Sequence, residues 1–265
     1  MKYILPVLLF LPLSVFAHNH VDIAAKNAPA VVAVNVAKKD GSTFTGTGFM
    51  LTADGVIATS RHVTENALYI NITFNNGAVS GEAVPFAHGE GARDLSLLKI
   101  QAAHLPYVTI GNSDTVVPGQ EITVIGNPRR LQNTVTSGLI SQVRLQPDGM
   151  LLHQISAPIS PSSSGSPVFN DNGEVVSVAF GSYEGDGNQN LNFAIPSNYL
   201  RQLASQHSIM LPREKPQKAR QPSSRAFINH IHRSWLILKS LCAKLKIWWD
   251  NQHHPARPVT PAAKR

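Results

Sequence analysis

Cysteine is nearly absent from this sequence of 265 residues, which contains only Cys242. A single cysteine excludes an intramolecular disulfide framework and a zinc site built from several cysteines. Charged residues are also few, at 15%, yet 43% of the residues are hydrophobic, a composition that excludes a wholly disordered chain. The length is sufficient for a hydrophobic core without covalent cross-links.

Acidic residues are scarce in one part of the chain. Residues 212–265 contain 12 basic and 2 acidic residues, whereas residues 1–211 contain 11 basic and 14 acidic ones. The positive charge therefore belongs to a tail, and the main body is mildly acidic. Nucleic-acid binding by the body is not expected, because such binding uses a basic surface.

A long uninterrupted apolar segment is missing as well. Residues 1–17 (MKYILPVLLFLPLSVFA) combine a basic start, an apolar stretch broken by prolines, and Val15 and Ala17 at the positions that a signal peptidase reads. This pattern predicts a secretory signal peptide cleaved after Ala17. A membrane anchor is the alternative, but the stretch is short and proline-broken for that role. We therefore expect a periplasmic or secreted protein.

Residues 18–211 alternate between apolar strands and turns, and we expect them to form one domain. The predicted strands are rich in Val, Ile, Thr and Phe and lie at 28–37, 42–52, 67–74, 95–100, 121–126, 134–145, 150–156, 166–170 and 174–180. Pairs such as Asn76-Gly77 mark turns between them. Because little helical periodicity lies between the strands, an all-β barrel or sandwich is expected. One short helix is predicted at 198–206, with Ser197 as its N-cap.

The tail divides into three segments. Residues 212–225 contain proline, glutamine and basic residues without an apolar anchor, which predicts a linker. In residues 226–250 apolar side chains recur at spacings of three and four, which predicts a basic amphipathic helix. Residues 251–265 are predicted to be disordered. Residues 226–249 could lie on an anionic membrane surface, dock on the acidic body or on another copy of the chain, or have no partner.

Three residues of catalytic type lie in distinctive contexts. His62 follows a strand, Asp94 directly precedes an apolar strand, and Ser164 lies in a tight turn that enters a strand. Each feature alone is more often structural, and the ordered set is the stronger signal. A serine nucleophile needs a base to accept its proton and a buried carboxylate to orient that base. Small residues around Ser164 would let backbone N–H groups face a developing oxyanion.

Six ordered motifs surround these residues. They are GTGF at 46–49 leading to TSRHV at 59–63, DLSLLK at 94–99, IGNP at 125–128, TVTSG at 134–138, SSSGSP at 162–167 and NFAIPS at 192–197. Together they resemble the trypsin-like (chymotrypsin-fold) serine proteases of the bacterial Deg/HtrA type, over about residues 27–206. The resemblance implies an all-β fold of two six-stranded β-barrels, followed here by the amphipathic helix, with His62 and Asp94 in the first barrel and Ser164 in the second.

The resemblance also assigns roles. His62 is the expected general base, Asp94 its orienting carboxylate and Ser164 the nucleophile, and the N–H groups of Ser162 and Ser164 are the expected oxyanion donors. The family pattern has glycine where this chain has Ser162 and Ser166. If the turn requires a positive φ at Ser162, the side chain costs about 1–2 kcal/mol and the peptide could flip away from the oxyanion.

Substrate-binding residues are expected on two segments. Pro158 and Ile159, which precede the nucleophile turn, should line the primary pocket; being uncharged, they favour a small or medium aliphatic residue over Arg or Lys. Ala179, Phe180 and Gly181 should pair with an extended substrate by strand addition, with core packing as the alternative for Phe180. No cofactor or metal is expected, because the histidines near the chain ends make weak sites at best.

These features predict an exported serine endopeptidase that cleaves flexible or unfolded proteins. Residues 212–265 are too few for the PDZ domain that some members of the family carry. Two alternatives stay open. The barrels could bind extended peptides, as a chaperone does, with weak or no catalysis. The tail could also block the active site, as in a zymogen.

Overall fold

The computed structural model describes residues 20–127, 133–182 and 191–212. The predicted signal peptide at 1–17 lies outside the described residues, as do the amphipathic helix at 226–250, the tail at 251–265 and all of the linker except residue 212. Within the described ranges, no helix has both the length and the apolar character needed to cross a membrane.

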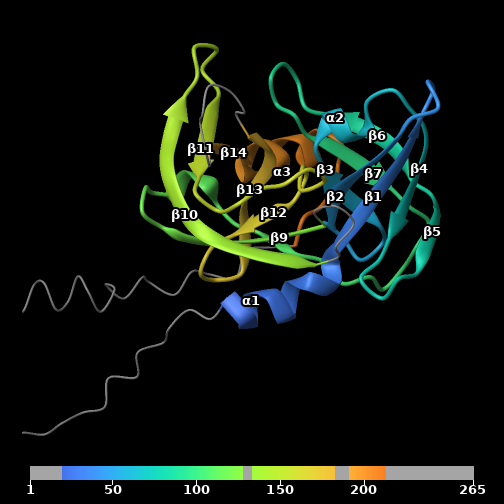
Figure 1. The fold of residues 1–265 in the computed structure, drawn as a ribbon, viewed down its shortest axis with the longest axis horizontal. Coiled ribbons are helices and arrows are strands. Elements are labelled where there is room, and N and C mark those ends of the chain that lie inside the picture. The colour runs from blue at the N-terminus through green and yellow to red at the C-terminus, as the bar shows by residue number, and fades with distance from the viewer. Residues whose placement is uncertain (1–19, 128–132, 183–190, 213–265) are drawn as a thin grey trace, which may run out of the picture. The chain divides into compact units, whose positions relative to one another are not determined.

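The N-terminal half forms a seven-stranded antiparallel sheet that curls into a half-barrel (Figure 1). Its strands pair in the order β5-β4-β1-β2-β3-β7-β6. They are β1 (Val31–Lys38), β2 (Thr43–Met50), β3 (Val56–Thr59), β4 (Ala67–Thr73), β5 (Val79–Glu82), β6 (Val84–His88) and β7 (Ser96–Lys99). The inner face buries apolar side chains such as Val34, Phe49 and Leu97 completely. Burial of this face is the main force that holds the sheet in its curled shape.

The C-terminal half forms a closed barrel. Its strands pair in the order β12-β9-β10-β11-β14-β13-β8, and an additional pairing of β12 with β13 closes six of them into a ring. They are β8 (Thr109–Ile110), β9 (Glu121–Gly126), β10 (Thr134–Leu145), β11 (Leu151–Ile155), β12 (Pro167–Phe169), β13 (Glu174–Ser182) and β14 (Asn192–Pro196). The predicted all-β class with two barrel-like sheets is confirmed; the first sheet differs in being open and having a seventh strand.

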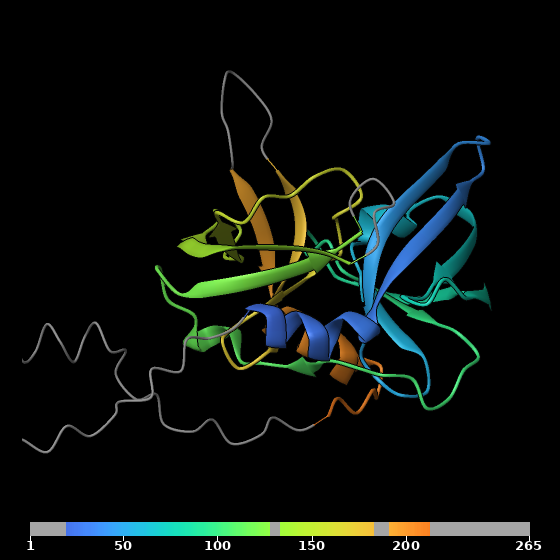
Figure 2. The same ribbon diagram turned by 60° about the horizontal axis from the view of Figure 1, so that its bottom comes forward.

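Short helical segments accompany the two sheets in the described part of the chain. They are α1 (His20–Asn27), the 3-10 turns η1 (Ala28–Ala30) and η2 (Ser113–Thr115), α2 (Arg61–Thr64) and α3 (Ser197–Gln206). Figure 2 shows α1 running along the base of the second barrel, where His20 Nδ1 lies 2.7 Å from Thr123 Oγ1. The predicted N-cap was wrong: Ser197 is the first helical residue, and its hydroxyl donates to the Gly111 carbonyl at 2.8 Å instead.

All nine predicted strands are present, but five further strands escaped prediction: β3, β5, β6, β8 and β14. Strands β5 and β6 lie at the two ends of the first sheet, and most of their side chains are half-buried or exposed. Because no side chain of β5 and only one of β6 is buried, neither strand shows the alternation of apolar and polar residues that predicts a half-buried strand. Strand β8 is only two residues long, and β14 ends in Pro196.

The two sheets meet where β2 approaches the end of β9. The backbone N–H of Asn127, directly after β9, donates to Thr47 Oγ1 on β2 at 2.9 Å. The N–H of Thr47 donates to the Ser164 carbonyl at 2.9 Å. These contacts hold the first sheet, which carries His62 and Asp94, against the part of the second barrel that carries Ser164.

The second barrel also buries a titratable side chain, that of His153, away from the contact between the two sheets. His153 on β11 is 1% exposed, and its Nδ1 lies 2.5 Å from Ser177 Oγ on β13. Because burial disfavours the charged imidazolium, it lowers the pKa of His153 from 6.5 to about 4. The neutral ring is therefore the native form.

This burial predicts a pH-dependent stability. Since the folded pKa of His153 is below the unfolded one, its contribution is complete above about pH 6.5 and falls as the pH drops toward 4, by about 3 kcal/mol. The variant His153→Gln keeps a hydrogen-bonding group but cannot titrate. In urea unfolding at a series of pH values, it should lose most of the slope between pH 6.5 and 4. The same change at the exposed His207 is the control, and an unchanged slope in His153→Gln would contradict the prediction.

Candidate active site

His62 and Asp94 are brought together by the pairing of two strands. Strands β3 and β7 run antiparallel with Thr59 opposite Ser96, so the residues after β3 face those before β7. The backbone N–H of His62 donates to Asp94 Oδ1 at 2.8 Å, and His62 Nδ1 lies 2.6 Å from Asp94 Oδ2. The carboxylate thus holds both the backbone and the ring of His62, and Nε2 is the ring nitrogen that Asp94 does not contact.

The Asp94 carboxylate is suited to stay ionised. Its side chain is 14% exposed, whereas that of His62 is 40% exposed. Burial alone would raise the pKa of Asp94, but the hydrogen bonds and charge of His62, together with a contact from Ser60, outweigh burial and hold the pKa below its usual value. The carboxylate therefore remains negative at neutral pH and stabilises a positive charge on the imidazole.

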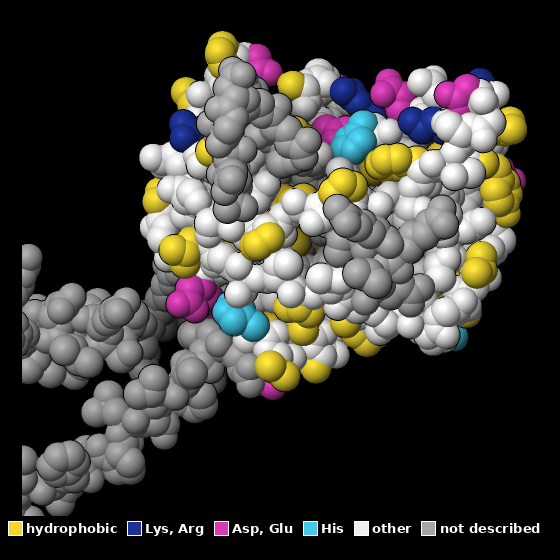
Figure 3. All heavy atoms as spheres, in the orientation of Figure 1, with side chains coloured by type: hydrophobic (Ala, Val, Ile, Leu, Met, Phe, Trp, Pro, Cys, Tyr) yellow, Lys and Arg dark blue, Asp and Glu magenta, His cyan; other side chains and the backbone are white. Residues whose placement is uncertain are grey.

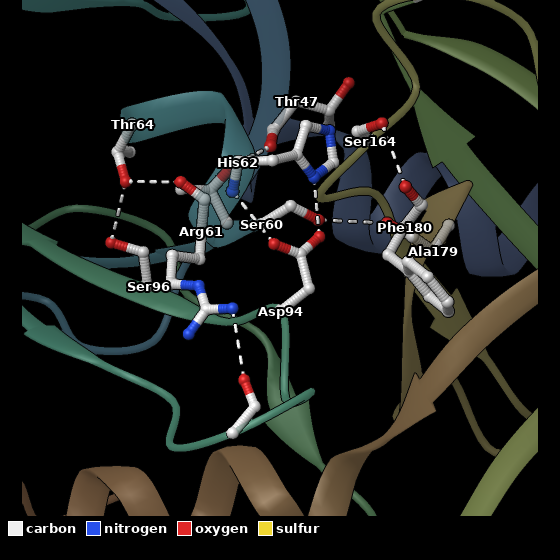
Figure 4. Close-up of polar contacts among 12 residues, drawn as sticks. Thr47, Ser60, Arg61, His62, Thr64, Asp94, Ser96, Ser164, Ala179 and Phe180 are labelled. Carbon is white, nitrogen blue, oxygen red and sulfur yellow. Dashed lines mark hydrogen bonds and ion pairs between the residues drawn. The ribbon is translucent and has the colours of Figure 1, made fainter. Parts of the chain in front are cut away.

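Arg61, next to His62, holds the loop that delivers Asp94. Its guanidinium donates to the carbonyls of Gly89 and Gly91, at 3.1 Å each (Figure 4 draws one of these bonds). A planar guanidinium presents donors in a fixed fork and can hold two carbonyls at once. This residue was not identified from the sequence, because the two carbonyls belong to a loop about thirty residues away.

Ser164 follows a turn that has the features of type II. The N–H of Ser163 donates to the Ser160 carbonyl at 2.9 Å, Pro161 occupies the second position, and Ser162 at the third position has φ = 76°. Glycine is the usual residue there, because a side chain makes positive φ unfavourable. The sequence analysis expected strain if the turn has a positive φ at Ser162, and the turn does have one. This φ sets the direction of the 161–162 peptide and hence of the Ser162 N–H.

The residue after Ser164 is fixed by close packing. Gly165 has φ = 90°, and a Cβ there would overlap the carbonyl oxygen of Thr47. Its N–H donates to the Ala179 carbonyl at 2.7 Å, and the Ala179 N–H donates to the Ser166 carbonyl at 2.9 Å. The nucleophile turn is therefore clamped between β2 and β13.

The Ser164 hydroxyl is not paired with the imidazole. Ser164 Oγ donates to the Phe180 carbonyl at 3.3 Å, and Figure 4 shows the Ser164 side chain beside the His62 ring but directed toward Phe180. Among the described residues, no hydrogen bond joins Ser164 to His62.

The two expected oxyanion donors have no acceptor within the described part of the chain. The neighbouring peptides are held: the Ser163 carbonyl accepts from the Ser166 N–H at 3.0 Å, and the Ser164 carbonyl accepts from the Thr47 N–H. The N–H groups of Ser162 and Ser164 themselves donate to nothing in that part. Two free N–H groups on one turn can bind a developing oxyanion.

The expected substrate-binding residues fall into two groups. Pro158 is exposed, and Ile159 is half-buried against the second barrel's apolar core. Ala179 is fully buried, and both its backbone groups bond to the nucleophile turn, so it supports that turn from behind. Phe180 is half-buried and packs partly on the main core, and Gly181 is half-buried beside it.

The charged side chains on the face drawn in Figure 3 have no single sign. Figure 3 shows acidic and basic side chains mixed along the upper edge of one face, with hydrophobic ones scattered over the rest. Such a face does not steer a strongly charged partner. The described residues contain no group of three or more His, Cys, Asp or Glu side chains arranged to hold a metal ion.

Comparison with known proteins identifies the class. A family described as "Trypsin-like peptidase domain" matches residues 46–178, half of the chain, so the chain belongs to the trypsin-like peptidases. Within this class it is similar to the putative serine protease HhoB of Synechocystis sp., with 36% identity over 60% of this chain and 39% of that protein. It is also similar to a probable periplasmic serine endoprotease, DegP-like, of Chlamydia trachomatis, with 37% identity over 61% of this chain and 33% of that protein.

Solved structures give the same result. The HtrA-type protease AlgW with a tripeptide has a TM-score of 0.64 and 28% identity, covering 72% of this chain and 65% of that one. The serine endoprotease from Yersinia pestis has a TM-score of 0.62 and 30% identity, covering 71% and 66%. The resemblance to Deg/HtrA proteases is thus confirmed. The chain spans between a third and two-fifths of the length of the two sequence relatives.

Because Ser162 is strained, its replacement by glycine should stabilise the protein. The variant Ser162→Gly should raise the free energy of unfolding by about 0.5–1 kcal/mol, because glycine adopts positive φ without the steric cost. Ser162→Ala removes the hydroxyl but keeps the strain, and it should give no such gain. Urea unfolding of the three proteins decides the matter; an equal gain in Ser162→Ala would show that the hydroxyl, and not φ, is responsible.

A substitution at Ser166 should also raise the free energy of unfolding. Its hydroxyl is buried without a hydrogen-bond partner in the described structure and occupies the space that a Cβ on Gly126 would need. Removing this unsatisfied group in Ser166→Ala should raise the free energy of unfolding by about 1 kcal/mol. Ser163→Ala is the matched control, because Ser163 Oγ accepts from the Ser160 N–H at 3.4 Å and its loss should lower stability. A destabilised Ser166→Ala would refute the assignment.

Proposed function

We propose that this chain is an exported serine endopeptidase that uses His62, Asp94 and Ser164. The observation that carries the proposal is the double contact of Asp94 with the backbone and ring of His62, with Ser164 on the facing barrel. The names of the relatives, serine proteases and a periplasmic endoprotease, support the reaction class and the export.

The reaction begins when Ser164 turns from the Phe180 carbonyl toward His62. Ser164 Oγ attacks the scissile carbonyl carbon while its proton passes to His62 Nε2, and Asp94 stabilises the imidazolium. The carbonyl oxygen becomes an oxyanion that accepts from the N–H groups of Ser162 and Ser164. The C–N bond then breaks as His62 returns the proton to the leaving amine. Water, deprotonated by His62, attacks the acyl-enzyme and releases Ser164.

The substrates we propose are flexible or unfolded proteins cleaved after small or medium aliphatic residues. Within the described residues, the Phe180 carbonyl accepts only from the Ser164 hydroxyl, so an extended segment can pair with β13 there, on the side away from β14, once that hydroxyl turns away. The uncharged Pro158 and Ile159 support the aliphatic preference. Two solved relatives, the HtrA-type protease AlgW with a tripeptide and the same protease with a decapeptide, support peptide binding.

One observation favours a second function. Because Ser164 donates to Phe180 and not to His62, the resting arrangement has no activated nucleophile. A protein that remains in this state would bind extended peptides without cleaving them.

Covalent labelling separates these functions. A fluorophosphonate probe reacts only with a serine activated by its base and oxyanion donors. We expect the full chain to be labelled and Ser164→Ala to remain unlabelled. Peptide mapping of a digested denatured protein should then show cleavage after Val, Ala or Ile. No labelling of the wild type, together with retained peptide binding, would support the peptide-binding function; cleavage after Arg or Lys would refute the proposed specificity.

The role of Asp94 predicts a specific kinetic loss. Asp94→Asn removes the negative charge and favours the wrong imidazole tautomer, so kcat should fall by about 10,000-fold. Steady-state hydrolysis of a peptide substrate measures the loss, and circular dichroism checks the fold. Asp22→Asn on the exposed side of α1 is the control and should retain wild-type kcat. A loss of less than about tenfold in Asp94→Asn would rule out this role for the carboxylate.

A further inference from the structure

Thr47 contacts the nucleophile turn through several groups at once. It lies on β2 of the first sheet and is fully buried. Its Oγ1 donates to the Ser162 carbonyl at 2.8 Å, and its N–H donates to the Ser164 carbonyl at 2.9 Å. Its own carbonyl accepts from Thr59 Oγ1 at 2.6 Å and closely faces Gly165. Thr47 of the first sheet thus hydrogen-bonds the carbonyls of Ser162 and Ser164, on either side of Ser163.

The direction of the Thr47 hydroxyl bond is fixed by a second contact. The Asn127 N–H donates to Thr47 Oγ1 at 2.9 Å, so this oxygen already acts as an acceptor. A hydroxyl has one proton. That proton is therefore available for the Ser162 carbonyl, and the Ser162–Ser163 peptide is held toward β2.

This contact lies where the turn is under strain. Ser162 has φ = 76°, and release of the strain would rotate the 161–162 peptide and its N–H. The Thr47 bond anchors the other side of the same residue. An anchor on the carbonyl restricts how the turn can relax, and small displacements of an oxyanion donor have large effects on rate.

We propose that the Thr47 hydroxyl is a positioning residue for the oxyanion hole. It acts through the Ser162 carbonyl and does not touch the substrate. The inference rests on the proposed function in one respect: the kinetic consequence requires that the turn be catalytic. The structural consequence, a looser turn without the hydroxyl, does not require catalysis.

Three variants test the role of the hydroxyl. Thr47→Val is nearly isosteric and keeps the backbone bonds but removes the hydroxyl. Thr47→Ser keeps the hydroxyl and removes the methyl group. Thr45→Val is the control, because it also replaces a threonine of β2 by valine. The Thr45 hydroxyl donates to Asn35 Oδ1 at 3.3 Å and has no bond to the turn. If Thr47→Val does not fold, Thr47→Cys replaces it, because a thiol is a weak donor of similar size.

The kinetic readout is the division of the effect between kcat and KM. We expect Thr47→Val to lower kcat by about 10- to 100-fold with KM changed by less than about twofold, because the loss concerns the transition state. Thr47→Ser and Thr45→Val should retain kcat within about threefold. Equal losses in Thr47→Val and Thr45→Val, or equal losses in Thr47→Val and Thr47→Ser, would overturn the proposal. So would a wild-type kcat in Thr47→Val.

Hydrogen exchange gives a readout that does not depend on catalysis. The N–H groups of Ser163 and Ser166 are bonded within the turn. In Thr47→Val, peptides covering 160–166 should exchange at least about tenfold faster than in Thr45→Val. If the wild type is inactive but this exchange increases, the proposed function fails and the positioning role stands. If the exchange is unchanged, the positioning role fails whatever the activity.

Discussion

The contact between β2 and the nucleophile turn is the constraint on which the rest of the site depends. His62 and Asp94 come from the first sheet, and Ser164 comes from the second barrel, so the proposed reaction requires that the two halves be held in register. The structure achieves this with hydrogen bonds that Thr47 donates to the turn from its N–H and hydroxyl, and with one that its Oγ1 accepts from the Asn127 N–H. Because these groups are buried, breaking any of the bonds would leave an unsatisfied polar group, which makes the arrangement well defined.

Two serines in the turn, Ser162 and Ser166, destabilise this arrangement. Ser162 has the positive φ that glycine adopts without strain, and Ser166 buries a hydroxyl without a partner in the described structure. Strain of this kind persists only where the surroundings impose it. Here the clamp between β2 and β13 provides the restraint. In the proposed mechanism, the balance between strain and clamp decides whether the Ser162 N–H faces the oxyanion, and it would connect the stability of the turn to the rate of the reaction.

Much of the architecture could be predicted from the sequence, because the central strands have buried apolar faces and clear turns between them. The edge strands β5 and β6 could not, since their side chains are largely exposed and lack a periodic pattern. The motifs identified His62, Asp94 and Ser164, and the structure brings His62 and Asp94 into contact. The roles of Thr47 and Arg61 depend on carbonyls distant in sequence, which no local pattern encodes. The rotamer of Ser164 also depends on three-dimensional packing alone.

The central claim is that this turn, despite its serines, presents both N–H groups to an oxyanion while Thr47 holds it from behind. A crystal structure of the protein with a phosphonate covalently bound to Ser164 tests the claim most directly. The account predicts a phosphonyl oxygen between the N–H groups of Ser162 and Ser164, a positive φ at Ser162, and a hydrogen bond from Thr47 Oγ1 to the Ser162 carbonyl. A negative φ at Ser162 with its N–H turned away from that oxygen would contradict the account.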